Sequence, residues 1–123
     1  MSGMPSIDLD DLKQNTDYAG YSLEDNIIKW YWEILSEYTN EDLAKLIQFI
    51  TGTSKIPLEG FSHLEGMNGL QKISIHRDVN VHQLPKSHTC FNQLDLPNYP
   101  SKEILKEKLR VVLTWGSEGF GFL

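Results

Sequence analysis

Residues 26–38 have the sequence NIIKWYWEILSEY. Apolar side chains recur in this segment at intervals of three and four residues, at Ile27, Trp30, Tyr31, Ile34, Leu35 and Tyr38. That spacing places them along one broad stripe of an amphipathic helix. The pattern therefore predicts a helix from Asn26 to Tyr38 whose apolar face packs against a core.

Three other segments also have helical patterns. Residues 39–50 begin with Thr39, a capping residue, and carry their apolar side chains on one face. Residues 101–115 have the same arrangement behind Ser101. A shorter segment, residues 6–15, offers capping oxygens ahead of two leucines and predicts a short helix.

The middle of the chain contains the strand patterns. Residues 71–77 alternate apolar and polar side chains, as a half-buried strand does, and residues 89–96 are expected to form a second strand. Residues 17–21 and 78–87 are expected to be loops, and the glycines after residue 116 do not favour helix. The predicted fold class is α/β (α+β), with a small mixed sheet packed against several helices.

Composition limits the classes of function. The chain has 123 residues, which suits one domain, and no run of about 18 apolar residues that would span a membrane. Eleven basic and 17 acidic residues give a net charge of −6, without a basic stripe on any predicted face. Nucleic-acid binding by the domain is therefore not expected.

The single cysteine, Cys90, excludes an intrachain disulfide and the zinc patterns that need two or four cysteines, and it disfavours a dithiol redox protein. The lack of cysteine pairs favours a reducing compartment, the cytoplasm or the nucleus. A lone cysteine is most often an inert core residue. His88 lies two residues before it, however, and an imidazolium at that range would favour the nucleophilic thiolate. Both interpretations remain open on these grounds.

Longer motifs resemble a known family. Residues 84–97, LPKSHTCFNQLDLP, resemble the active-site segment of HECT-type E3 ubiquitin ligases, and residues 49–57 and 119–121 resemble two further hallmarks of that family. Residues 64–69 and 75–78 are most similar to the very large ligases that also carry UBA and WWE domains. The resemblance extends over essentially the whole chain.

The resemblance implies that the chain is the C-terminal lobe (C-lobe) of a HECT domain. Residues 1–5 would follow the hinge between the lobes, residues 6–116 would form the C-lobe, and residues 117–123 would be a flexible tail. The N-terminal lobe (N-lobe), which binds the ubiquitin-conjugating enzyme (E2), and the substrate-selecting domains would lie upstream. The lobe is expected to be a monomer.

The resemblance also implies roles for individual residues. Cys90 would accept ubiquitin from the E2 as a thioester and pass it to a substrate lysine, without a cofactor or a metal. His88 and Thr89 would support it, Leu84 would contact ubiquitin, and Phe120 would dock on the N-lobe. The alternative is a non-catalytic ubiquitin- or protein-binding module in which Cys90 is structural.

Two acidic groups lie where they could assist attack by a substrate lysine, the C-terminal carboxylate and Asp95. Some members of the family end in an acidic side chain, whereas this chain ends with Leu123, so only the terminal carboxylate could act there. In a continuous strand over residues 89–96, alternation would put Asp95 on the opposite side from Cys90. Asp95 is therefore not expected to be a catalytic base.

Overall fold

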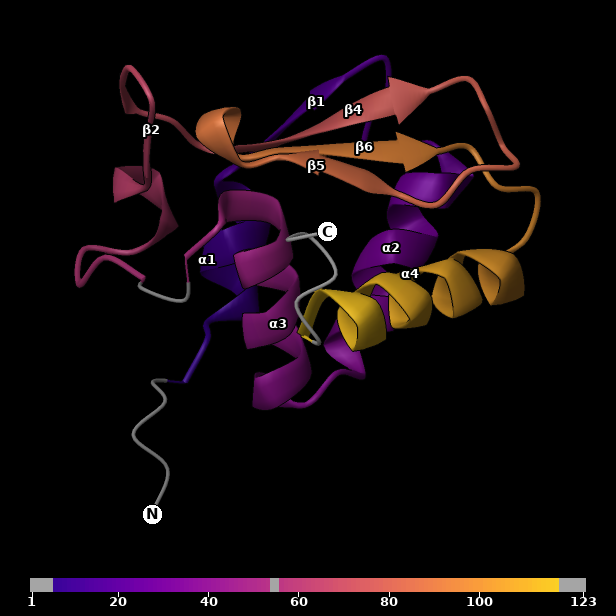
Figure 1. Ribbon diagram of the computed structural model, residues 1–123, viewed down its shortest axis with the longest axis horizontal. Coiled ribbons are helices and arrows are strands. Elements are labelled where there is room, and N and C mark those ends of the chain that lie inside the picture. Colours follow the sequence, from indigo (N-terminus) through magenta and orange to yellow (C-terminus); the bar gives the residue numbers. More distant parts are fainter. Residues whose placement is uncertain (1–5, 54–55, 118–123) are drawn as a thin grey trace.

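The computed structural model of the chain describes residues 6–53 and 56–117, with side chains up to residue 114. Helices cover one face of a four-stranded sheet, and a small hairpin lies beside it (Figure 1). The helices are α1 (Leu9–Gln14), α2 (Asn26–Ser36), α3 (Asn40–Thr51) and α4 (Lys102–Ser117). The sheet strands are β1 (Thr16–Ala19), β4 (Ile73–Asp78), β5 (Lys86–His88) and β6 (Gln93–Pro97). The hairpin joins β2 (Glu65–Gly66) to β3 (Gly69–Leu70), and two 3-10 turns are η1 (Phe61–His63) and η2 (Thr89–Phe91).

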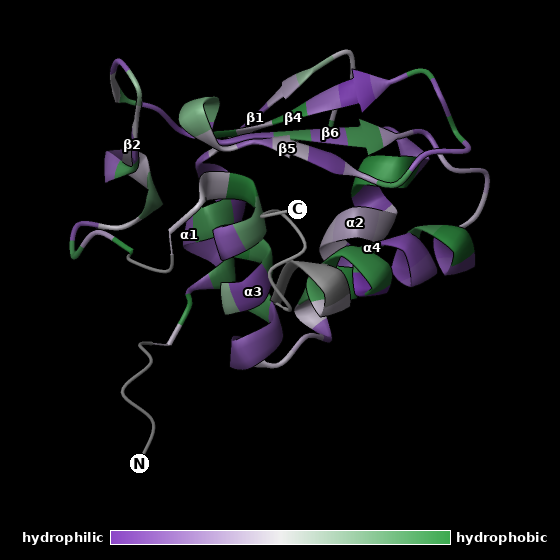
Figure 2. Ribbon diagram, viewed as in Figure 1, coloured by the Kyte–Doolittle hydropathy of each residue, from purple (hydrophilic) through white to green (hydrophobic). Residues whose placement is uncertain are grey.

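The sheet is mixed, with the strand order β1-β4-β6-β5. β1 and β6 both run parallel to β4, whereas β5 runs antiparallel to β6. Ile75 of β4 is aligned with Tyr18 of β1 and Leu94 of β6, so apolar side chains line the face that the helices cover. Hydrophobic and hydrophilic residues alternate along the helices and strands in Figure 2, as expected of elements with one buried face. The predicted fold class is confirmed.

The core forms between the sheet and the helices, as the sequence patterns predict. α2 buries six side chains, namely Ile27, Ile28, Tyr31, Trp32, Ile34 and Leu35. α4 buries Leu105, Leu109, Val112 and Leu113 against the same core. The indole N–H of Trp32 donates to the hydroxyl oxygen of Tyr18 at 3.0 Å, so even this polar group of the core has a partner.

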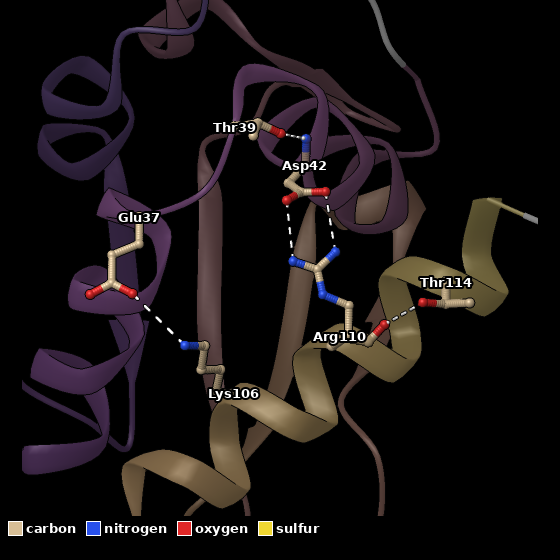
Figure 3. Close-up of polar contacts among 6 residues, drawn as sticks. All are labelled: Glu37, Thr39, Asp42, Lys106, Arg110 and Thr114. Carbon is tan, nitrogen blue, oxygen red and sulfur yellow. Dashed lines mark hydrogen bonds and ion pairs between the residues drawn. The ribbon is translucent and has the colours of Figure 1, made fainter.

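A bidentate ion pair joins the exposed face of α4 to the first turn of α3 (Figure 3). Both terminal nitrogens of Arg110 donate to the carboxylate of Asp42, each at 3.2 Å, and the guanidinium lies 5.4 Å from the centre of the Tyr38 ring. Thr39 caps α3, because its hydroxyl oxygen accepts the backbone N–H of Asp42 at 3.1 Å. The hydrogen bonds from Arg110 hold the pKa of the Asp42 carboxyl below its usual value of 3.8.

This contact makes stability depend on pH. A carboxyl whose pKa is lowered by folding stabilises the fold above its usual pKa, and the contribution is lost as the pH falls through the lowered value. We expect Arg110→Met to lower the free energy of unfolding by at most about 1 kcal/mol near neutral pH, because the pair is partly exposed. Urea unfolding across a pH series measures this. The part of the difference from the wild type that depends on Asp42 should disappear in acid, leaving only what the Tyr38 contact contributes, and a difference that does not change with pH would contradict the assignment to Asp42.

Three expectations about individual segments are wrong. Residues 17–21 were expected to be a loop, but β1 pairs with β4 through residues 57 positions away, such as Thr16 with Ile73. The expected loop at residues 78–87 contains the start of β5. The expected strand at residues 89–96 begins only at residue 93.

Within the described residues, no helix is both long enough and apolar enough to cross a membrane.

Candidate active site

Cys90 lies in η2, the short turn that connects β5 to β6, and its thiol is free and exposed. The β5–β6 ladder pairs Ser87 with Leu94 and His88 with Gln93, so residues 86–97 form a hairpin with the cysteine at its tip. A core position for Cys90 is therefore wrong, and the inert-hydrophobe explanation does not apply to it. An exposed sulfur at a tip is accessible to another macromolecule.

The turn ends at Asn92, whose backbone is left-handed with a φ of 52°. Asparagine tolerates this conformation better than most residues with a side chain. The backbone N–H of Asn92 donates to the carbonyl of Thr89 at 3.3 Å, and its own carbonyl accepts from the N–H of Ser74 in β4 at 3.0 Å. The chain can therefore leave the turn and enter β6 directly.

The β2–β3 hairpin packs directly against the cysteine. The backbone N–H of Met67 donates to the carbonyl of Cys90 at 2.8 Å. A Cβ atom on Gly66 would lie 2.9 Å from that same carbonyl oxygen and 2.8 Å from the Cβ of Gln71. The glycine is therefore required by lack of space, and the motif at residues 64–69 is a support for the turn.

The end of α3 packs against the other side of the turn. Gly52 caps the helix in the left-handed conformation, with a φ of 79°. A Cβ there would come within 3.2 Å of the Cβ of Thr89. Thr89 thus lies against the helix end, which gives it a packing role beside any role in chemistry. The motif at residues 49–57 and the cysteine motif meet at this point.

His88 forms a close pair with Asp95. Its Nε2 lies 2.7 Å from the Oδ2 atom of Asp95, whose Oδ1 accepts from the Nε2 of Gln93 at 2.7 Å. The expected position of Asp95 opposite Cys90 assumed a continuous strand, which η2 interrupts, and it stays a prediction. Within the described residues, the imidazole has no hydrogen bond to the sulfur of Cys90. The structure therefore shows His88 oriented by a carboxylate, which fixes the ring and favours a proton on Nε2.

Of the two other predicted site residues, the structure describes only Leu84, which is not brought to the turn. Leu84 is 37% exposed and precedes β5, whereas Cys90 follows that strand, so β5 separates them. Phe120 lies outside the described residues. Cys90 does not line the open groove of about 490 Å³, whose lining residues are Thr53, Ile56, Pro57, Glu59, His63, Leu64, Glu65 and Leu70. The described part of the chain holds no cluster of three potential metal ligands.

Comparisons with known proteins agree with these motifs. The family model described as HECT-domain (ubiquitin-transferase) matches residues 1–123. The chain is 51% identical to the E3 ubiquitin-protein ligase UPL1 of Arabidopsis thaliana over 99% of its length. It is 53% identical both to the E3 ubiquitin-protein ligase TOM1-like of Neurospora crassa, over 99% of the chain, and to the E3 ubiquitin-protein ligase HUWE1 of Mus musculus, over 98%.

These relatives are far longer than the chain. It spans only 3% of the length of each of the three, which agrees with the predicted similarity to very large ligases. The match covers every motif at the turn, from the end of α3 to β6. The chain therefore belongs to the HECT-domain (ubiquitin-transferase) family.

Proposed function

We propose that the complete protein is an E3 ubiquitin-protein ligase, that this chain forms its C-lobe, and that Cys90 carries ubiquitin as a thioester. The observation that best supports this is the exposed thiol at the tip of the β5–β6 hairpin. The β2–β3 hairpin and the end of α3, which both carry family motifs, pack against the turn that holds it. A non-catalytic module with a structural cysteine does not account for an exposed sulfur.

The proposed reaction has two steps, and each is an acyl transfer. The thiolate of Cys90 attacks the carbonyl of the E2–ubiquitin thioester, a new C–S bond forms, and the E2 thiolate leaves. A substrate lysine amine then attacks the new thioester, an amide forms, Cys90 leaves as thiolate, and the amine loses a proton to solvent or a nearby base. Neither step needs a cofactor, so the contribution of the lobe is to position the sulfur.

The supporting residues act at short range in this proposal. His88, oriented by Asp95, supplies a polar group two residues from the sulfur, and Thr89 holds the turn against the end of α3. Leu84 contacts ubiquitin at the other end of β5, and Phe120 docks on the N-lobe. The partners are ubiquitin, an E2 bound by the N-lobe, and protein substrates bound by other domains. The protein would act in the cytoplasm or the nucleus as a monomer.

A ubiquitin derivative with an electrophile in place of its C-terminal carboxylate tests the site. The complete ligase is incubated with this probe, digested, and analysed by mass spectrometry. We expect the probe on Cys90 in the folded protein and a much slower reaction after denaturation, because attachment depends on recognition of ubiquitin. Attachment only at other cysteines of the ligase, or equal labelling of folded and denatured protein, would overturn the proposal.

A milder prediction concerns Leu84. Leu84 lies outside the core cluster, so Leu84→Ala should change the free energy of unfolding by less than about 1 kcal/mol. Loss of an apolar contact with ubiquitin should slow transfer about fivefold to thirtyfold, the equivalent of about 1–2 kcal/mol. Ligation rates and thermal unfolding measure the two effects. Val79→Ala is the control, since Val79 is exposed in the same loop. If Leu84→Ala loses as much free energy of unfolding as it loses in the free energy of transfer, the contact role is contradicted.

A further inference from the structure

The side chain of Asn92 is completely buried beside the exposed cysteine turn. Its amide nitrogen donates to two backbone carbonyls, at 3.2 Å to Glu65 and 2.7 Å to Gln71. Both partners can only accept, so the orientation of the amide is determined by them. The two carbonyls flank the β2–β3 hairpin, one at its first residue and one just after its last. One side chain thus ties both legs of the hairpin to the turn.

The turn has few bonds of its own. Within it, the N–H of Asn92 reaches the carbonyl of Thr89 only at 3.3 Å, a long hydrogen bond, and no side chain caps its start. The shorter bond, at 2.8 Å, comes from the N–H of Met67 in the hairpin to the carbonyl of Cys90. The position of Cys90 is therefore set from outside, by a hairpin that Asn92 holds in place.

Asn92 also carries a cost that packing alone does not explain. Its Oδ1 atom is buried and has no hydrogen-bond partner among the described residues. An unpaired buried carbonyl oxygen destabilises a fold. Glycine would adopt the left-handed backbone without this cost, but it would lack the amide that bonds to the hairpin. Asparagine combines the left-handed backbone with two donors.

We propose that Asn92 is a positioning residue for ubiquitin transfer, which holds the β2–β3 hairpin against the turn so that the sulfur of Cys90 is presented in one geometry. The inference rests on the proposed role of Cys90. Asn92 touches neither ubiquitin nor the reacting atoms, and it acts through the backbone of the turn. Misplacement of a reacting group by about 1 Å can slow a reaction by about 100-fold, so a loosened turn should affect the transfer step itself.

The test compares Asn92→Gly with a control that loses a similar buried bond elsewhere. Thr16→Val is suitable, because the Thr16 hydroxyl is buried and donates to the carbonyl of Leu12 at 2.7 Å, and β1 lies at the opposite edge of the sheet from β5. Single-turnover transfer from saturating E2–ubiquitin to the complete ligase is measured for each variant, together with thermal unfolding. Saturation separates slow transfer from weak binding.

We expect Asn92→Gly to transfer ubiquitin about 10- to 100-fold more slowly than the wild type and Thr16→Val to stay within about twofold. Similar rates for Asn92→Gly and the wild type, or an equal loss in Thr16→Val, would overturn the proposal. If Asn92→Gly does not fold, Asn92→Ser, which is neutral and can keep at most one of the two donations, is judged by the same criteria. If Cys90→Ala still forms the reductant-sensitive ubiquitin adduct, the proposed function itself is refuted, independently of Asn92.

Discussion

Cys90→Ala is expected to abolish the ubiquitin adduct of the complete ligase and its transfer to substrates, while leaving the fold intact. The thiol is the only group at the turn that can form a thioester, so no slower route through the same position remains. The side chain is exposed, and none of the described residues forms a hydrogen bond with its sulfur. The free energy of unfolding should therefore change by less than about 0.5 kcal/mol.

The measurement combines an adduct assay with thermal unfolding. E1, E2, ATP and ubiquitin are mixed with the complete ligase, and the adduct is resolved with and without reductant. The wild type should give a band that reductant removes, and Cys90→Ala should give none. Cys90→Ser is the matched control, because a serine oxygen can form an ester that reductant does not cleave. A reductant-sensitive band in Cys90→Ala would contradict the assignment.

The helices of this fold were predictable because their signals are local. The three- and four-residue spacing in residues 26–38 and 101–115 reports a buried face within a few turns of chain, and α2 and α4 bury those faces. The structure broadens the first stripe, since Ile28 and Trp32 are buried as well. Tertiary packing can bury side chains next to the predicted stripe, and the spacing of apolar residues does not show how many.

The strand β1 could not be predicted from its own four residues. Thr16–Ala19 is too short for alternation to be distinguished from chance, and its hydrogen bonds are made with β4, more than 50 residues later. The turn around Cys90 was missed for a different reason. Phe91, Leu94 and Leu96 suggested one continuous strand, whereas Asn92 adopts the left-handed conformation and Phe91 is exposed. The asparagine was the available signal, because it favours turns.

The motif resemblance located the cysteine, but the arrangement around it depends on three-dimensional pairing. The contact of His88 with Asp95 follows from the register of the β5–β6 ladder, which the turn at residues 89–91 determines. The need for glycine at position 66 follows from an approach to the carbonyl of Cys90, 24 residues away in sequence. Neither relation has a local signature.

Gly66→Val is expected to damage both stability and transfer, because the hairpin and the cysteine turn leave no room for a side chain. The φ of Gly66 lies outside the range that disfavours residues with a side chain, so the effect would come from contact and not from backbone strain. Its Cβ would lie 2.9 Å from the carbonyl oxygen of Cys90, a backbone atom that cannot rotate away. Overpacking of this kind costs about 1–3 kcal/mol.

The functional effect of Gly66→Val should exceed its effect on stability. A hairpin pushed from the turn loses the bond from the N–H of Met67 to the carbonyl of Cys90, and displacement of the sulfur by about 1 Å should slow transfer by about 100-fold. Single-turnover transfer and urea unfolding measure the two effects. Asn68→Ala is the matched control, because Asn68 is exposed at the tip of the same hairpin and should remain within about twofold of the wild type. If Gly66→Val loses stability as expected but transfers ubiquitin at the wild-type rate, the hairpin is a structural support only, and the geometry of the turn does not limit the reaction.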